Sequence, residues 1–314
     1  MKICVFDPWK YKFSQPIIDH WKEQGHDVRQ TLYCDPEWIK WSDVSYFESI
    51  DNNLIAWNRE MEPTPWRNAR PQKKAIARGI DIDLWMRLPL GVDWTMVNDL
   101  ILIQPWMEQV MRAYLGDTVL PPITVIPCGV DVNKFTYKER INPGFHLAYV
   151  GNLWEIKNPA RAIEILYALV KKNPSLPWKL TIVGDTQPLK NGSPYYLNHM
   201  QWLVEHYGLQ DRVEFHTERI EDLVSFYHEI DYMIVTSYKE AFSYVTAEAM
   251  SCGVKPVIYH FWNADQIWPK ELIYVTHEEA VDIIMGEYHS RQYRDYVADK
   301  YPLSKMLESF DKLL

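Results

Sequence analysis

Two glutamates stand eight positions apart in a segment whose other residues could hold a phosphate. Glu240 follows the apolar run 232–236, and Glu248 lies in an expected helix over 244–252. The first N–H groups of that helix, around residues 243–246, lack partners inside it and could bind an anion. Carboxylates beside the anion could accept hydrogen bonds from hydroxyls. The pattern indicates a sugar nucleotide, although this spacing also arises by chance in a chain with 42 acidic residues.

The elements that would position these residues alternate between strands and helices, which predicts α/β folding with doubly wound parallel sheets. Strands are expected at 2–6, 27–33, 44–47, 75–82, 100–103, 123–126, 146–150, 178–183, 213–216, 232–236 and 256–259. The prominent helices are expected at 16–24, 159–170, 194–207, 220–229, 244–252, 278–286 and 289–314. In such sheets ligands bind at the carboxyl ends of the strands, and two facing domains would leave a cleft.

The pattern changes near Pro121-Pro122, and this change predicts two Rossmann-like domains. Residues 1–127 would form the acceptor side and residues 128–288 the side that binds the nucleotide sugar. Residues 289–314 would form a C-terminal helix that packs back on the first domain. A length of 314 residues suits two domains better than one core.

Composition excludes several classes of protein. The chain is 47% hydrophobic and 24% charged, which excludes a disordered or fibrous protein. The net charge of −9 disfavours binding of nucleic acid over the whole surface. The four cysteines are far apart, so we expect reduced thiols and no zinc site. The first residues are too short an apolar run for a signal peptide, and no run is long enough to span a membrane, which predicts a cytoplasmic protein.

The segment 237–257 resembles the donor half of the GT-B glycosyltransferases, in particular the large retaining family GT4. Its motif has two glutamates with seven residues between them, as at Glu240 and Glu248, followed here by Ala249-Met250, Gly253 and Pro256. Four other segments are also similar to motifs of the family, namely 125–135, 149–153 with Lys157-Asn158, 180–185 and 213–227. The resemblance is good over residues 123–258 and covers the first 120 residues in architecture only.

The resemblance implies transfer of a sugar from a nucleotide diphosphate sugar, a UDP- or GDP-sugar, to a hydroxyl acceptor with retention of anomeric configuration. Glu248 would hold the ribose hydroxyls, Glu240 the hydroxyls of the sugar, and Lys157 the diphosphate; Lys157 could instead be a solvated lysine at a helix entry. The other implied donor contacts are Gly151, Asn152, Gly184, Ile220, Phe242, Ser243, Tyr244 and Val245. No metal or other cofactor is expected, because Lys157 and the helix N-terminus would stabilise the leaving diphosphate.

The chain departs from the family pattern at three places. Asn152 stands where the family usually has an arginine, so a basic group elsewhere would have to substitute or donor binding would weaken. The loop 7–12 lacks the usual glycines. In the place of a histidine near the sugar, the chain offers Asp81 or Arg78 as catalytic candidates; alternatively, Asp81 and Asp83 cap the next element.

No motif in the sequence identifies the acceptor. A saccharide, a lipid-linked glycan and a modified DNA base all remain open. Five cations, Arg67, Arg70, Lys73, Lys74 and Arg78, could form a patch for lipid phosphate, the membrane periphery or nucleic acid, or simply a solvated loop. Two alternatives therefore stay open, namely a phage-type hydroxymethyl-pyrimidine DNA glycosyltransferase and a catalytically decayed sugar-nucleotide-binding module. An epimerase or a phosphorylase fits the two-glutamate motif and the chain length less well.

Overall fold

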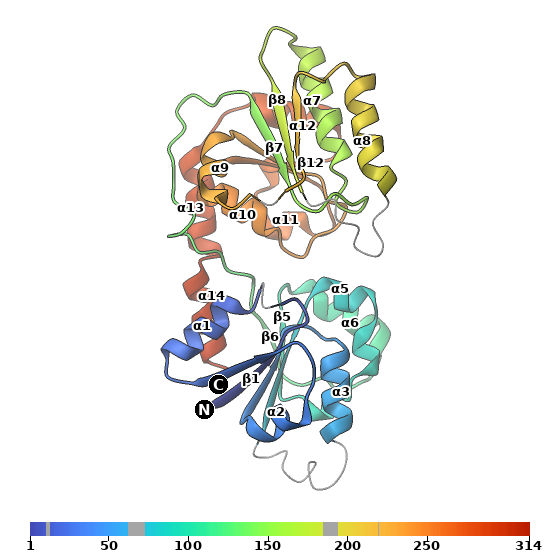
Figure 1. Ribbon diagram of the computed structural model, residues 1–314, viewed down its shortest axis with the longest axis vertical. Helices are drawn as coiled ribbons and strands as arrows, with labels where there is room; N and C mark the ends of the chain where they lie inside the picture. Colours follow the sequence, from blue (N-terminus) through green and yellow to red (C-terminus); the bar gives the residue numbers. More distant parts are fainter. Residues whose placement is uncertain (11–12, 62–72, 185–193, 219) are drawn as a thin grey trace. The chain divides into compact units, whose positions relative to one another are not determined.

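Two six-stranded parallel sheets organise the computed structural model, which describes residues 1–10, 13–61, 73–184, 194–218 and 220–314 (Figure 1). Each sheet belongs to one compact unit. Unit 1 comprises Met1–Gly129 and Leu303–Leu314, and unit 2 comprises Val130–Pro302. The chain therefore passes from unit 1 to unit 2 after Gly129 and returns to unit 1 only for its last twelve residues.

The sheet of unit 1 has the strand order β2-β1-β3-β4-β5-β6. Its strands are β1 (Lys2–Phe6), β2 (Asp27–Thr31), β3 (Val44–Phe47), β4 (Lys74–Gly79), β5 (Asp99–Leu102) and β6 (Ile123–Val125). Its helices are α1 (Gln15–Glu23), α2 (Pro36–Trp41), α3 (Asn52–Met61), α5 (Asp81–Trp85), α6 (Trp106–Leu115) and α14 (Leu303–Asp311), with short 3-10 turns at Leu88–Gly91 and Trp94–Met96. The central strands are buried on both faces, as expected for a parallel sheet between helices.

Aromatic side chains join the first and last helices of unit 1 to its sheet. Trp21 on α1 meets Tyr46 on β3 edge-on at 5.5 Å between ring centroids, and Phe310 on α14 at 6.2 Å. All three rings are buried. Helices α1 and α14 consequently lie side by side although almost 300 residues separate them in sequence (Figure 1).

The sheet of unit 2 has the strand order β12-β11-β10-β7-β8-β9. Its strands are β7 (His146–Val150), β8 (Lys179–Val183), β9 (Val213–His216), β10 (Tyr232–Val235), β11 (Lys255–Tyr259) and β12 (Ile273–Tyr274). Its helices are α7 (Ala160–Lys172), α8 (Pro194–His206), α9 (Leu223–Glu229), α10 (Tyr244–Ser251), α11 (Ala264–Ile267), α12 (His277–Met285) and α13 (Ser290–Lys300), with a 3-10 turn at Lys270–Leu272. Helix α7 packs against both α8 and α12, and α10 packs against α13.

The end of the chain differs from the single helix predicted over 289–314. The structure has two helices there, α13 in unit 2 and α14 in unit 1. The break falls at Tyr301-Pro302, because proline supplies no N–H and disfavours helix at the residue before it. Tyr301 instead accepts a hydrogen bond from the Val130 N–H at 2.9 Å through its carbonyl oxygen. Only the last twelve residues, rather than all of 289–314, join unit 1.

Candidate functional site

An ion pair joins the loop that follows β10 to the segment that precedes α7, both in unit 2. The Nζ of Lys157 is 2.6 Å from Oε1 of Glu240, and Ser237 donates its hydroxyl to the same oxygen at 2.8 Å. The two side chains are 27% and 13% exposed, respectively. The pair is therefore close enough to solvent to meet a ligand and buried enough for its charges to act strongly.

Backbone contacts hold Lys157 against that loop. Thr236 donates its hydroxyl to the carbonyl of Lys157 at 2.7 Å, and the N–H of Tyr238 donates to the carbonyl of Ile156 at 3.0 Å. Asn158 has the positive φ of 46° that turns the chain into α7. These local constraints bring a lysine and a glutamate that are 83 residues apart in sequence into direct contact.

At the start of α10, the N-cap residue makes no side-chain hydrogen bond to the backbone N–H groups of the helix. Ser243 occupies the N-cap position, but its Oγ accepts a hydrogen bond from the hydroxyl of Thr246 at 2.7 Å. Phe242 is buried against Trp268 and Tyr301, with ring centroids 5.6 and 5.2 Å away, which fixes the chain just before the helix. The first turn, which includes Tyr244 and Val245, thus has the character of an anion site.

Glu248 lies further along the same helix and is half-buried. It accepts a hydrogen bond from the hydroxyl of the buried Tyr227 at 2.9 Å. Burial raises the pKa of Tyr227 well above its ordinary value, and the nearby charge of Glu248 raises it further. Tyr227 therefore stays protonated and orients one oxygen of Glu248. Ile220, which is also half-buried, precedes α9.

Two glycines meet at the carboxyl ends of β7 and β8. The N–H of Gly151 donates to the carbonyl of Val183 at 2.9 Å, and a Cβ on Gly184 would overlap the carbonyl oxygen of Gly151 and lie 2.7 Å from Leu153. Gly184 is thus required by close backbone approach. The neighbouring Asn152 is exposed, and its carbonyl accepts a hydrogen bond from the hydroxyl of Tyr149 at 2.8 Å.

Arg161 is a cation that the sequence patterns did not single out. It lies in the first turn of α7, with its guanidinium carbon 3.7 Å from the ring centroid of Tyr259 and 5.4 Å from that of Tyr238. Its Nε and Nη1 are buried and make no hydrogen bond within the described part of the chain. Arg161 and Lys157 thus both contact the loop 236–240. An arginine four residues after a lysine is typical of an exposed helix surface, so no pattern in the sequence indicated the role of Arg161.

The catalytic candidates in unit 1 have different environments. Arg78 is buried against Glu48 at 2.5 Å, and each side chain is 1% exposed, so Arg78 is an internal partner and not a group that faces an acceptor. Asp81 begins α5 and is half-buried. Asp83 is fully buried and accepts hydrogen bonds from the N–H groups of Ile50 and Ile80. The alternative interpretation, in which Asp81 and Asp83 both cap the next element, therefore holds for Asp83.

The basic cluster does not gather into one surface among its described members. Lys73 donates to the carbonyls of residues 39, 40 and 42 at 2.8, 3.0 and 2.6 Å, which closes the end of α2. Lys74 pairs with Asp99 at 2.9 Å, and Arg78 is buried at the other end of β4. Each of these three cations thus has a partner within unit 1, and contact of the predicted patch with a lipid phosphate, a membrane or a nucleic acid stays a prediction. Arg67 and Arg70 lie outside the described residues.

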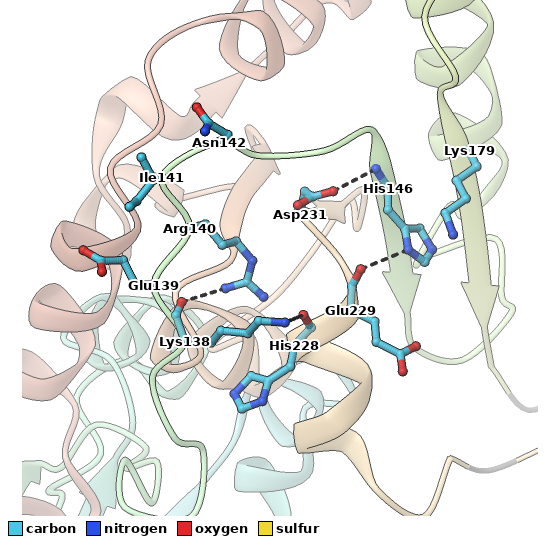
Figure 2. A pocket seen from close by; sticks show the side chains of 10 residues that line it. All are labelled: Lys138, Glu139, Arg140, Ile141, Asn142, His146, Lys179, His228, Glu229 and Asp231. Atoms are coloured by element: carbon cyan, nitrogen blue, oxygen red, sulfur yellow. Dashed lines mark hydrogen bonds between the residues drawn. The ribbon is translucent and has the colours of Figure 1, made fainter.

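An open pocket of about 560 Å³ lies at the amino ends of β7, β8 and β10 (Figure 2). Arg140 lines it and donates to the carbonyls of Cys252 and Tyr227 at 2.7 and 2.6 Å. Lys138 donates to the carbonyl of His228 at 2.8 Å. Arg140 and Lys138 thus bind the segment that enters unit 2 to the rest of that unit. The pocket lies at the edge of the sheet opposite to Lys157 and Glu240. Since open α/β sheets bind ligands at the carboxyl edge, this pocket is not the candidate donor site.

The described residues lack both a metal-binding cluster and a membrane-spanning helix. No three or more His, Cys, Asp or Glu side chains gather there in a way that could hold a metal ion. No helix in those ranges combines the length and the apolar character needed to cross a bilayer.

Part of the chain is similar to known glycosyltransferases. Residues 144–272 match the family model described as glycosyl transferases group 1. The D-inositol 3-phosphate glycosyltransferase of Paenarthrobacter aurescens (strain TC1) is 29% identical over 161 residues, which cover 48% of this chain and 37% of that protein. The GDP-mannose:cellobiosyl-diphosphopolyprenol alpha-mannosyltransferase of Xanthomonas oryzae pv. oryzae (strain PXO99A) is 28% identical over 138 residues, 43% of this chain and 34% of that protein. The chain thus spans little more than a third of the length of the relatives it matches.

Solved structures resemble the whole chain. Sucrose-phosphate synthase from Thermosynechococcus elongatus has a TM-score of 0.77 at 15% identity, covering 100% of this chain and 98% of that one. Anabaena Alr3699/HepE in complex with UDP-glucose has a TM-score of 0.77 at 14% identity, covering 100% and 99%. At such identities the likeness shows the fold alone, and it confirms the GT-B fold class predicted from the sequence. The match to the glycosyl transferases group 1 model, over residues 144–272, takes up the greater part of unit 2.

Proposed function

We propose that the protein transfers a sugar from a nucleotide diphosphate sugar to a hydroxyl acceptor with retention of configuration. The observation that carries this proposal is the ion pair of Lys157 and Glu240, which lies just before the N-terminus of α10, with Glu248 on the same helix. The names of the relatives, which are glycosyltransferases, and the UDP-glucose complex of Anabaena HepE support it.

Each side chain then has a definite role. Lys157 and the first N–H groups of α10 bind the diphosphate, and Glu240 accepts hydrogen bonds from hydroxyls of the sugar. Glu248, oriented by Tyr227, accepts hydrogen bonds from the ribose hydroxyls. The main chain near Ile220 contacts the base. Arg161 braces Tyr238 and so helps to keep the loop of Glu240 in place.

In the reaction, the bond between the anomeric carbon and the diphosphate oxygen breaks and a bond to the acceptor oxygen forms on the same face. A phosphate oxygen of the departing nucleotide takes the proton of the acceptor hydroxyl. Lys157 and the helix N–H groups stabilise the charge that develops on the diphosphate, which is why we propose that no divalent metal is needed. Asp81 in unit 1 is our candidate for a contact to the acceptor.

The acceptor of the proposed reaction is a compound with a free hydroxyl group. Lys73, Lys74 and Arg78 each have a partner within unit 1, so these three cations favour neither a DNA base nor a membrane surface. We further propose a cytoplasmic location, which the lack of a disulfide among the four cysteines supports, since reducing compartments keep thiols in this form.

Thermal unfolding with UDP, GDP, ADP, dTDP and CMP tests the donor site. A nucleotide at 100 times its Kd stabilises by about 2.7 kcal/mol, so one of them raises Tm by several degrees. Glu248→Gln and Lys157→Met reduce that shift, and the exposed Glu278→Gln on α12 leaves it unchanged. Added EDTA also leaves it unchanged. A shift that persists in both site variants would place the nucleotide elsewhere.

Turnover separates an enzyme from a decayed binding module. Release of the nucleoside diphosphate from the matching sugar nucleotide is expected for the wild type and is lost in Lys157→Met. The anomeric coupling constant of the product in an NMR spectrum then reports retention or inversion. Nucleotide binding without any turnover would favour the decayed module.

A further inference from the structure

The ion pair of Lys157 and Glu240 joins two groups that the proposed function gives to different parts of the donor. Lys157 would bind the diphosphate and Glu240 the sugar, but the ammonium nitrogen of one is 2.6 Å from a carboxylate oxygen of the other. In the described part of the chain, no other carboxylate lies within ion-pair distance of Lys157. A diphosphate that contacts Lys157 therefore lies beside a negative charge as well as a positive one.

Buried side chains of one loop hold both members of this pair. Ser237 donates its hydroxyl to Oε1 of Glu240 at 2.8 Å, and Thr236 donates its hydroxyl to the carbonyl of Lys157 at 2.7 Å. Ser237 and Thr236 are both buried, and so is Ala241, which follows Glu240 directly. The pair is therefore not a chance contact between two mobile surface side chains, whose charges water would screen.

Two positions that could have strengthened the cationic side of this site do not do so. Asn152 is exposed and carries no charge. The guanidinium of Arg161, four residues after Lys157, stacks on the ring of Tyr259 at 3.7 Å instead of pairing with Glu240. The single positive charge of Lys157 is thus balanced by the carboxylate that it contacts.

The two nucleotides of the proposed reaction differ in charge next to this pair. In the sugar nucleotide, the sugar esterifies the terminal phosphate and blocks its second ionisation. In the nucleoside diphosphate that remains after transfer, this ionisation has a pKa of about 6, so near pH 7.5 the terminal phosphate carries about one negative charge more. The proton that it took from the acceptor passes to solvent in that step. The product therefore brings more negative charge to Glu240 and no sugar hydroxyl.

We infer that Glu240 makes the donor site bind the sugar nucleotide in preference to the nucleoside diphosphate that remains after transfer. This inference rests on the proposed function. With the sugar nucleotide, the carboxylate accepts hydrogen bonds from sugar hydroxyls, and a charged acceptor makes such bonds strong. With the product, the same carboxylate repels the terminal phosphate in a site where low exposure limits screening. Lys157 attracts both nucleotides, so Glu240 supplies the difference that favours product release.

Isothermal titration calorimetry of the full chain with UDP, UDP-glucose, GDP and GDP-mannose at pH 7.5 tests this inference. Glu240→Gln keeps an oxygen for the hydroxyl of Ser237 and loses the charge. We expect it to bind the nucleoside diphosphate at least about threefold more tightly than the wild type does, because a like charge has been removed from beside the terminal phosphate. The sugar nucleotide gains no affinity, since an amide is a weaker acceptor than a carboxylate. Glu240→Ala, which also removes the charge, gives the same gain if Glu240→Gln does not fold.

Two control variants isolate the charge of Glu240. Glu240→Asp keeps a carboxylate and is expected to bind the nucleoside diphosphate no more tightly than the wild type does. Glu155→Gln removes the same charge from an exposed position two residues before Lys157. It should leave both dissociation constants within about twofold, because salt screens exposed charges. The Tm of each variant, measured in parallel, verifies folding.

The outcomes separate this inference from the proposed function. If the wild type binds these nucleotides through Lys157 but Glu240→Gln binds the nucleoside diphosphate equally or more weakly, the inference is overturned and the proposed donor site stands. A pair that only holds the loop together gives that result, because loss of a structural contact does not raise affinity. Equal tightening in Glu155→Gln or Glu240→Asp would also overturn the inference. If none of the four nucleotides binds, the inference and the proposed function fail together.

Discussion

The carboxyl group of Asp83 couples the stability of unit 1 to pH. Burial raises its pKa from an ordinary 3.8 to about 7, against the opposing effect of its hydrogen bonds from Ser49, Ile80 and Ile50. Between these values the folded state holds a proton that the unfolded state has released. The contribution of Asp83 to the unfolding free energy is therefore largest below about pH 4. It decreases by about 1.4 kcal/mol for each pH unit as pH rises toward 7.

Asp83→Asn removes that contribution while keeping an oxygen for the two backbone N–H groups. We expect the variant to gain stability relative to the wild type as pH rises from 4.5 to 7.5, measured by urea unfolding. Asp51, whose pKa burial raises to about 6, stays in both proteins and leaves part of the pH dependence in place. Parallel curves for the two proteins would show that Asp83 titrates normally.

The buried pair of Arg78 and Glu48 makes a second prediction at the scale of single residues. Arg78→Met leaves the Glu48 carboxylate without its cation in a site that is 1% exposed. We expect a loss of about 3–5 kcal/mol in the unfolding free energy of unit 1. The control is Lys172→Met, which removes a pair with Asp282 whose side chains are 53% and 69% exposed and which should cost below about 1 kcal/mol. Equal effects in urea unfolding would contradict this account.

At the scale of elements, the close approach of β7 and β8 depends on Gly184. Gly184→Ala forces a methyl group into the Gly151 carbonyl and Leu153, so the ends of both strands must separate. We expect a loss of about 1–3 kcal/mol or more, and weaker nucleotide binding because the same strand ends carry the donor loop. Gly208→Ala is the control, since Gly208 has φ +66° with no atom within 4 Å of an added Cβ. Its cost is that of backbone strain alone, about 1–2 kcal/mol, with nucleotide binding kept.

The sequence predicts best what neighbouring residues determine. The strand before Glu240, the helix of Glu248 and the turn at Lys157 are local patterns, and their elements lie where the periodicity indicates, within a few residues. Contacts between residues that are distant in sequence cannot be predicted from such local patterns. Lys73 is bound by carbonyls at 39–42, and Arg161 meets Tyr259 almost 100 residues away, so neither role is visible before the chain is folded.

At the scale of the whole molecule, the two units differ in how the chain builds them. Unit 2 is one continuous segment, whereas unit 1 needs α14 from the far end of the chain. Met306, Phe310 and Leu313 of that last segment are at most 8% exposed and complete the core around Trp21 and Tyr46. Burying each such side chain stabilises by roughly 1.5–3 kcal/mol, so the three together contribute about 5–9 kcal/mol. This is comparable to the whole stability of an ordinary domain, about 5–15 kcal/mol.

We therefore expect the two units to behave differently as isolated fragments. Residues 130–302 alone should melt cooperatively in calorimetry and bind the same nucleotide as the full chain. Residues 1–129 alone should show no cooperative transition, because the loss of α14 removes most of their margin of stability. Joining 303–314 to residue 129 should restore the transition with only a short Gly-Ser linker, since a Cβ on Gly129 would lie 2.8 Å from Cα of Leu303. A cooperative melt of 1–129 equal to that of the joined fragment would show that the aromatic contacts of α14 add little to this core.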